Sequence, residues 1–334
     1  METRVDGQLV HKKEATRSVF VNGVNLVVGG RWLPVARIQD EVWIGAEAAG
    51  EPEPLIASLK KGILKADLFT FAQRLPNTHP RYEYPMVWDN VAAIPITRYE
   101  DWWENRLPQI ARKNVRRGYK RGVVAAIMEF NDELVAGIVG IHDETPIKQG
   151  EPFAHYGKPF DVVKREYGTF LDRSDFIAAH YEGELIGVLK LVYVDQVASI
   201  MQIIAKEAHQ DKRPTNILIA KAVERCVVKG MSFLVYGKYT YGNKTNSSLS
   251  EFKCRNGFEK IDFPRYYIPL TLKGEMALKL KLHHGLLGLL PARLIAWLLS
   301  LRARYYKIRM HSQASATSEM PEKASKSLSE LDCS

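Results

Sequence analysis

The stretch over residues 198–236 constrains the fold of this chain more than any other part. Residues 198–205 are mostly apolar or β-branched and predict a buried strand. A polar loop follows, after which Thr215 or Asn216 can cap the first turn of an amphipathic helix. Another apolar run at 233–236 predicts a second strand. A strand, a helix and a strand of these lengths form a right-handed crossover between parallel strands, so the sequence predicts an α/β protein.

The two loops that follow these strands form the predicted ligand-binding edge. Ligands of such crossover units bind beyond the carboxyl ends of the parallel strands, which here means residues 206–215 and 237–246. The second loop is rich in tyrosine, lysine and glycine. Ser248 and Glu251 then have the spacing of a capping box, which predicts a short helix that ends at Gly257.

The run from Asn246 to Phe258 resembles the last helix of the GNAT acyltransferase fold. Its spaced residues are Asn246, Leu249, Phe252, Lys253, Gly257 and Phe258. The Phe-Lys pair is similar to the FemAB-like branch, the non-ribosomal peptidyl transferases and their GNAT relatives, and the resemblance extends upstream to about Tyr99. It implies an α+β fold of the GNAT type, with two GNAT-like halves, a mixed twisted sheet and a splayed pair of parallel strands.

The sequence pattern divides the chain into five parts. In the N-terminal part, hairpin signals are followed by a helix and by a strand at 68–72, which is the same order as in the crossover segment and the residues before it. This order predicts a degenerate copy of the same half-fold. Residues 42–44 predict a strand, and the proline-containing stretch 82–96 predicts a linker or an edge strand. The predicted parts are a polar leader (1–18), an N-terminal degenerate GNAT-like domain (19–98), a FemAB-like GNAT domain (99–272), an amphipathic basic helical segment (273–310) and a disordered tail (311–334).

Charge and cysteine content narrow the partners and the compartment. The net charge of +9 favours an anionic partner, such as a phosphorylated cofactor, nucleic acid or a membrane face. Cys226, Cys254 and Cys333 lack the spacing of a metal site, so we expect reduced thiols in a cytosolic protein and no bound metal. Residues 1–13 lack an apolar run, so we expect no secretory signal.

A basic helix is predicted between residues 105 and 121. Leu107, Ala111, Val115 and Tyr119 recur every four residues and predict a narrow buried stripe. The opposite face carries Arg112, Lys113, Arg116, Arg117, Lys120 and Arg121. This face is either an ordinary solvated surface or a binding surface for phosphates. In FemAB-like proteins a basic helix of this kind opens the second domain, so the resemblance supports its placement.

Three residues are candidates for the chemistry of acyl transfer. Lys253 stands where many GNAT enzymes carry a tyrosine acid, and its cation can stabilise a developing oxyanion, unless it is an exposed lysine on a helix. Tyr241 can donate to a leaving group or stack on a base, unless it is an ordinary core or surface tyrosine. His155 lies in a loop, residues 145–157, that resembles the acceptor-side loop of the FemAB-like family. It is either a proton carrier near neutral pH or a structural histidine.

A donor-binding segment is predicted around the start of the helix between the two strands of the crossover. The first N–H groups of such a helix can bind phosphate. The GNAT signature there is Gln or Arg, two residues, Gly, one residue, and Gly or Ala. This chain keeps Gln210 but carries Arg213 and Thr215 at the small positions, which would crowd a pyrophosphate, although Lys212 and Arg213 can compensate by charge. The resemblance implies acyl-CoA or aminoacyl-tRNA as the donor. The predicted cofactor-binding residues are Ile203, Ile204, Gln210, Lys212, Arg213, Thr215, Asn216 and Asn246.

Residues 276–310 differ in composition from the rest of the chain. The apolar runs at 286–290 and 294–299 are too short to cross a bilayer, and lysines and arginines surround them. This composition is typical of an interfacial helix on an anionic membrane face. The alternative is a helix docked on the protein or on a second subunit.

These features predict an N-acyltransferase that transfers an acyl or aminoacyl group to an amine of a cell-envelope or polysaccharide precursor. The reaction is expected at the cytoplasmic membrane face, with a small-molecule or lipid-linked amine acceptor, tRNA as a further candidate partner, and membrane contact through residues 276–310. The acceptor class rests on the family resemblance and on the C-terminal segment. The alternative is a non-catalytic binding protein of the GNAT fold that has lost the cofactor loop.

Overall fold

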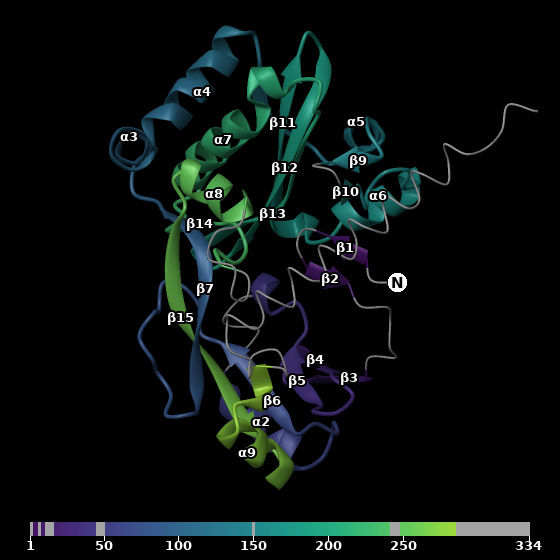
Figure 1. The fold of residues 1–334 in the computed structure, drawn as a ribbon, viewed down its shortest axis with the longest axis vertical. Coiled ribbons are helices and arrows are strands. Elements are labelled where there is room, and N and C mark those ends of the chain that lie inside the picture. The colour runs from purple at the N-terminus through teal and green to yellow at the C-terminus, as the bar shows by residue number, and fades with distance from the viewer. Residues whose placement is uncertain are drawn as a thin grey trace, which may run out of the picture. The chain divides into compact units, whose positions relative to one another are not determined.

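The structure is a computed structural model of the chain (Figure 1). It describes residues 3–5, 8–10, 17–44, 51–148, 151–240 and 248–284. The chain forms two compact units, Met1–Glu275 and Met276–Ser334. Tyr241, Asn246, Cys333, the tail at 311–334 and most of the segment 276–310 lie outside the described residues.

Within the described residues of the first unit, one sheet of 11 strands contains nearly all of the β-structure. Two hairpins stand apart from it, β1 (Thr3–Val5) with β2 (Gln8–Val10), and β9 (Ile147–Lys148) with β10 (Glu151–Pro152). The order in the large sheet is β3 (Arg17–Val21), β4 (Val24–Gly29), β5 (Val35–Ile38), β6 (Leu68–Ala72), β15 (Glu259–Pro269), β7 (Met86–Pro95), β14 (Phe233–Val235), β13 (Val197–Ala205), β12 (Glu184–Val194), β11 (Ser174–Tyr181) and β8 (Val124–Met128).

The sheet is built from two halves with the same local order. In one half the antiparallel strands β11, β12 and β13 lead through helix α7 (Pro214–Val228) to β14, which pairs parallel with β13. In the other half β3, β4 and β5 lead through α2 (Pro52–Lys60) to β6, which pairs parallel with β5. The predicted fold class, a mixed sheet in two similar halves with parallel pairs, is therefore confirmed.

Each half gives its last long strand to the other. β7 follows β6 in the chain but pairs with β14, whereas β15 follows β14 but pairs with β6. The two exchanged strands also pair with each other, from Glu259 opposite Ala93 to Tyr266 opposite Met86, which makes the sheet continuous.

The prediction that residues 82–96 form a linker or an edge strand is wrong. β7 runs between β15 and β14 in the middle of the sheet. Pro85 stands just before the strand and Pro95 is its last residue, so the missing proline N–H groups fall at the ends of the ladder. The strand predicted at 42–44 is also wrong, because Glu41–Trp43 form a 3₁₀ turn (η1).

Helices cover both faces of the half that contains β11 and β12, as Figure 1 shows. The side chains of Ile177 and Ala179 pack with α7 and α4 (Gln109–Lys120), whereas Phe176 and Ala178 pack with α5 (Asp132–His142) and α6 (Phe160–Tyr167). Successive residues of a strand point to opposite faces, so β11 is buried on both sides. The remaining helices and turns are α3 (Tyr99–Asp101), the π-turn η2 (Trp102–Arg106), η3 (Leu171–Arg173), η4 (Gln210–Lys212), α8 (Ser248–Arg255), α9 (Leu272–Lys279) and η5 (Leu282–His284).

The basic helix is shorter and more exposed than its sequence pattern predicted. Leu107 precedes α4, and Ala111 and Val115 are buried as predicted, but Tyr119 is 45% exposed and does not belong to the buried stripe. Gly118 takes the buried position near the helix end, where a Cβ atom would lie 2.4 Å from Ile217 Cδ1 and 2.5 Å from the Lys212 carbonyl oxygen. This close approach sets α4 against the start of α7.

The parallel pair β13 and β14 opens the sheet at the place where ligands were expected. Pairing stops at Ser199 opposite Val235, but β13 continues to Ala205. The strands therefore part, as the resemblance implied. None of the helices in the described part of the chain is long and apolar enough to cross a membrane.

Candidate functional site

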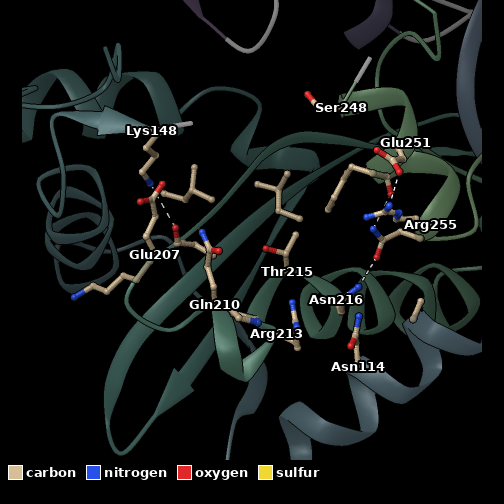
Figure 2. Close-up of a pocket in the computed structure, with 18 of the residues that line it drawn as sticks. Asn114, Lys148, Glu207, Gln210, Arg213, Thr215, Asn216, Ser248, Glu251 and Arg255 are labelled. Carbon is tan, nitrogen blue, oxygen red and sulfur yellow. Dashed lines mark hydrogen bonds and ion pairs between the residues drawn. The ribbon is translucent and has the colours of Figure 1, made fainter. Parts of the chain in front are cut away.

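A large pocket of about 1040 Å³ lies at the carboxyl end of β13 (Figure 2). Its walls come from the end of β13, the loop that leads into α7, one side of α4, helix α8 and the segment around the β9–β10 hairpin. These elements are far apart in the sequence, so the pocket exists only in the folded chain. Its position agrees with the ligand-binding edge that the crossover unit predicted.

Most of the predicted site residues that the structure describes line this pocket. They are His155, Ile203, Ile204, Gln210, Arg213, Thr215 and Asn216. Lys212 and Lys253 do not line it. Tyr241 and Asn246, the other two predicted residues, lie outside the described residues, so their roles stay predictions.

Lys253 is a buried lysine, and the alternative that it is exposed on a helix surface is wrong. It is 1% exposed, and its ammonium donates a hydrogen bond of 2.7 Å to the Lys238 carbonyl oxygen. The ammonium also lies 4.6 Å from the centre of the Tyr236 ring. Burial lowers the pKa of Lys253 to about 8. In this position Lys253 holds α8 against the loop after β14 and does not line the pocket. The predicted role in stabilising an oxyanion would therefore be indirect and would depend on that loop.

Lys212 turns away from the pocket. Its ammonium lies 4.4 Å from the centre of the Tyr181 ring and 3.5 Å from Asp211 Oδ1. Asp211 in turn accepts a hydrogen bond of 2.8 Å from Arg121 at the end of α4. Lys212 is thus part of the packing between the β13–α7 loop and its neighbours.

The start of α7 differs from the predicted cap. Pro214 is the first helical residue and Arg213 is the N-cap, with left-handed backbone angles of φ 60° and ψ 42° and no side-chain cap bond. Neither Thr215 nor Asn216 therefore caps the helix; the Asn216 side chain instead donates 2.8 Å to Asn256 Oδ1 at the end of α8. Pro214 has no N–H, but the next N–H groups of the first turn have no partner within the helix and carry its positive dipole end.

Arg213 contributes a cation to this end of the pocket. Its Nε atom is buried and has no hydrogen-bond partner among the described residues. A guanidinium beside a helix N-terminus is suited to bind an anion. In the GNAT signature the same position is small, so the size of Arg213 would crowd a pyrophosphate. Its positive charge, in contrast, would attract one.

The loop from β13 to α7 is held in place from outside. The two carboxylate oxygens of Glu144 accept hydrogen bonds of 2.6 Å from the Glu207 N–H and 2.8 Å from the Ala208 N–H. Lys206 forms an ion pair of 2.5 Å with Glu184 at the β11–β12 turn. These contacts hold the loop against its neighbours.

Lys148 is a pocket residue that sequence reasoning missed. Its ammonium lies 4.3 Å from the centre of the Phe153 ring and 3.5 Å from the Ala205 carbonyl oxygen. Burial lowers the pKa of Lys148, while the carboxylates of Glu144 and Glu207 oppose this change. Figure 2 shows Lys148 and Glu207 on the same side of the pocket. The signal in the sequence that includes Lys148 is the loop at 145–157, in which the predicted site residue was His155.

His155 is buried beside a second histidine. It is 6% exposed, and its ring centre lies 4.9 Å from that of His142 on α5. The Nδ1 atom of His155 lies 3.1 Å from the ammonium of Lys158, which also contacts both carboxylate oxygens of Glu166 at 2.8 and 2.7 Å. Burial, together with the nearby His155 and lysines, lowers the pKa of His142 to about 3.

Helix α8 forms the opposite wall. Glu251 and Arg255 line the pocket and form an ion pair with each other one turn apart (Figure 2). Ser250, behind them, donates a hydrogen bond of 2.8 Å to the Tyr239 carbonyl oxygen and so ties the helix to the loop after β14. Among the residues that the structure describes, no group of His, Cys, Asp and Glu side chains has the arrangement of a metal site.

Comparison with known proteins supports the fold. No family model matches this chain, and no curated protein matches it. Among solved structures it is similar to FemX, with a TM-score of 0.53 and 11% identity over 83% of this chain and 88% of the FemX chain. The chain has the fold of FemX. Two further matches are L-PGS from Bacillus licheniformis, with a TM-score of 0.49 and 13% identity over 82% of this chain and 89% of that one, and a tandem GNAT protein from the clavulanic acid biosynthesis pathway, with a TM-score of 0.39 and 11% identity over 80% and 81%.

The FemX similarity confirms the predicted FemAB-like form of the GNAT fold. At 11% identity the similarity concerns the fold, so the roles of single residues rest on the geometry of the pocket. In this FemX-like fold the pocket joins two features that suit a group-transfer reaction. One is a helix start with Arg213, which is suited to bind an anion, and the other is a corner with the buried His155 and the half-buried Lys148 and Glu207.

Proposed function

We propose that this protein is an N-acyltransferase that moves an acyl or aminoacyl group from a thioester or ester donor to an amine. The observation that carries the proposal is the pocket itself. Seven residues predicted from the sequence, drawn from separate segments, line one cavity of about 1040 Å³ at the start of α7. A cavity of this size holds a large donor and an acceptor side by side, and such proximity is the main requirement of the reaction.

The proposed chemistry needs no covalent intermediate on the protein. The amine nitrogen attacks the carbonyl carbon of the donor, the bond from that carbon to the leaving sulfur or oxygen breaks, and the amine loses one proton. The Lys148 ammonium, in a partly buried site, stabilises the negative charge that develops on the carbonyl oxygen. The Glu207 carboxylate, which also lines the pocket, accepts the proton from the amine. The leaving group takes up a proton from solvent.

The donor is proposed to bind with its phosphates at the start of α7. The first-turn N–H groups and the Arg213 guanidinium supply the positive potential. Arg213→Gly tests this role, because glycine relieves the left-handed backbone conformation but removes the charge. We expect the affinity for acetyl-CoA to fall about tenfold in isothermal titration. A gain in affinity would mean that Arg213 only crowds the donor.

Two donor classes remain to be distinguished by experiment. The exposed face of α4, with Lys113, Arg117 and Lys120, extends the positive surface beside the pocket and suits a polyanion such as aminoacyl-tRNA. Titration of the full chain with acetyl-CoA, with longer acyl-CoAs and with tRNA compares the two donors directly. Steep salt dependence with tRNA, and no binding of any acyl-CoA, would favour aminoacyl transfer.

The acceptor is proposed to be an amine of a cell-envelope or polysaccharide precursor, reached at the cytoplasmic face of a membrane. This part rests on the FemAB-like resemblance and on the basic, apolar composition of residues 276–310. In the described part of that segment, Met276 and Leu280 lie one helical turn apart and are 62% and 58% exposed. A mass-spectrometric search for a copurified ligand, followed by transfer assays with amino-sugar and lipid-linked amines, tests the acceptor class.

A second candidate is a binding protein of the same fold that does not catalyse transfer. The start of α7 favours it, because Arg213 and Thr215 replace the small residues of the GNAT signature and Pro214 removes one N–H donor. If the chain binds a donor tightly but releases no thiol or tRNA in the presence of any amine, this second function is correct.

A further inference from the structure

A second, smaller cavity lies in the middle of the sheet, where the exchanged strands β7 and β15 pass between the two halves. Its volume is about 130 Å³, and it shares no described lining residue with the large pocket. We propose that this cavity is a second binding site, which takes a small neutral molecule with an apolar body and one oxygen that can form a hydrogen bond. This site is independent of the transfer reaction proposed above.

Four strands form the floor of the cavity. Their lining side chains are Val91 on β7, Val197 on β13, Val235 on β14 and Phe263 on β15. The adjacent residues Ala92, Ala198 and Leu234 belong to the core that packs against α7. Because successive side chains of a strand point to opposite faces, the cavity lies on the face of the sheet away from α7. Its floor is apolar and draws on both exchanged strands.

Ser199 is the polar residue of this floor. It lies two residues after Val197 on β13, so both side chains are on the same face. Ser199 is only 4% exposed, and within the described part of the chain its hydroxyl has no hydrogen-bond partner. A buried hydroxyl is stabilised by a partner, and since it can both donate and accept, an oxygen of a ligand in the cavity can be that partner.

The charged groups at the rim of the cavity balance one another. Arg74 forms an ion pair of 3.8 Å with Asp195 and donates a hydrogen bond of 2.8 Å to the Glu41 carbonyl oxygen. Arg265 forms ion pairs of 3.1 Å with Glu41 and 2.9 Å with Asp89. Two cations and two carboxylates therefore line the cavity, and their formal charges cancel. An ion that entered would lose its hydration without gaining an excess opposite charge, so the site favours a neutral ligand.

The volume limits the size of the ligand. A protein cavity of about 150 Å³ holds a molecule of the size of benzene. The present cavity, at about 130 Å³, therefore admits a ligand of roughly six or seven non-hydrogen atoms. Branched aliphatic groups and small rings have this size and match the valine and phenylalanine floor. An amide, ester or alcohol of such a group also supplies the oxygen for Ser199, and this is the class of ligand that we assign.

The direct test is methyl nuclear magnetic resonance of the full chain with ¹³C-labelled valine, titrated with isovaleramide. Valine labelling separates the two pockets, because among the described residues five valines line the second cavity and none lines the large one. We expect the signals of Val91, Val197 and Val235 to shift with a Kd on the order of 1 mM, as suits so small a ligand. No shift of these signals up to about 20 mM isovaleramide, twenty times that Kd, would overturn the proposal.

Two charged analogues test the preference for a neutral ligand. Isovalerate and isopentylamine have nearly the same apolar body as isovaleramide but carry a negative and a positive charge. We expect both to bind at least about tenfold more weakly, because the rim supplies no net charge for either. Binding of either ion as tightly as isovaleramide would contradict the assigned class.

Two variants test the residues of the cavity. Val197→Phe places a ring in the cavity from a half-buried position and should abolish the shifts of Val91 and Val235. Ser199→Ala should weaken isovaleramide binding about threefold to tenfold, as the loss of one hydrogen bond implies. The matched control is Val228→Phe at the end of α7, where Val228 is 70% exposed, and it should leave binding unchanged.

Thermal unfolding of each variant shows whether it is folded. Binding by a folded Val197→Phe chain that equals binding by the natural chain would place isovaleramide elsewhere and overturn the site. If Val197→Phe does not fold, Ser199→Ala decides, because it removes only one buried atom. Undiminished binding by Ser199→Ala would then overturn the proposed hydrogen bond.

Discussion

Asp89 on β7 and Lys238 in the loop after β14 form an ion pair of 2.8 Å that connects the two halves of the sheet. Asp89 also accepts a hydrogen bond of 2.9 Å from Arg265 Nε on β15. Burial alone would raise the pKa of Asp89, but Lys238 and Arg265 outweigh it and lower the pKa below its ordinary value. The exchanged strands β7 and β15 therefore hold the loop that leads to α8, one wall of the pocket.

Removing the Asp89 carboxylate should destabilise the chain strongly. Asp89→Ala removes one of the two carboxylate partners of Arg265, a mostly buried cation whose side chain is 21% exposed, and leaves it only the ion pair with Glu41. We expect a loss of about 3 kcal/mol in the free energy of unfolding, measured by urea denaturation. The control is Lys238→Met. The Lys238 side chain is 51% exposed, so loss of its ion pair with Asp89 should cost at most about 1 kcal/mol. Equal effects of the two substitutions would contradict this assignment.

Gly118 should resist a substitution that usually stabilises helices. A Cβ atom there would lie 2.4 Å from Ile217 Cδ1 and 2.5 Å from the Lys212 carbonyl oxygen, so α4 must move away from α7. We expect Gly118→Ala to cost roughly 1–3 kcal/mol. Gly140 on α5 has no atom within 4 Å of the corresponding position, and Gly140→Ala should stabilise by about 0.5–1 kcal/mol. Thermal or urea unfolding of both variants gives the comparison, and a stabilising Gly118→Ala would show that α4 packs differently.

Much of the fold could be predicted from local sequence patterns. The crossover of β13, α7 and β14 was readable because its strands are apolar runs and because Gly230, which has a φ of 66°, stands two residues after the last residue of α7. The hairpin of β11 and β12 also carries a local signal, because Gly183 stands at its turn with a φ of 83°. β7 was misread because a proline weakens a central strand only when its missing N–H falls inside the ladder, and the sequence does not show where the ladder ends.

The candidate site was predictable as a region but not in all its residues. The position of the loop from Gln210 to Asn216 followed from the crossover geometry. The burial of Lys253 did not follow from its helix, because the loop after β14 covers it. Lys148 was missed because its place in the pocket depends on a contact between the β9–β10 hairpin and the end of β13, which no local pattern records.

The buried lysine Lys253 should make stability depend on pH in the alkaline range. Its pKa is about 8 in the folded chain against an ordinary value of 10.5. Between these values the unfolded chain binds more protons than the folded one, so the free energy of unfolding rises with pH. The total gain from this residue is roughly 3 kcal/mol. We expect Lys253→Met to flatten the rise between pH 8 and 10.5, whereas Lys260→Met, at an exposed position on β15, should leave it unchanged. An identical pH profile for Lys253→Met and the natural chain would argue against this burial.

The C-terminal segment should bind anionic membranes. Its apolar residues favour insertion by burial, and its seven lysines and arginines between Lys279 and Arg309 add roughly 1 kcal/mol each near an anionic surface. We expect the full chain to sediment with vesicles that contain anionic lipid and to be released in part by high salt. A chain that ends at His284 keeps α9 and should stay in the supernatant. If the full chain does not sediment at low salt, or the shortened chain unfolds, the segment is a structural part of the protein.

Lys148 and Lys212 provide a matched test of the pocket. Both are lysines near the β13–α7 loop, but only Lys148 lines the cavity, while Lys212 packs on Tyr181. If the Lys148 ammonium stabilises the charge on the carbonyl oxygen, Lys148→Met should lower kcat by about 100-fold, with little change in the affinity for the donor. Lys212→Met should leave kcat within about twofold, although the sequence alone made it the stronger candidate for the donor site. Thiol or tRNA release, measured with an amine acceptor at saturating donor, gives both values. A larger loss from Lys212→Met than from Lys148→Met would place the reacting groups outside this pocket.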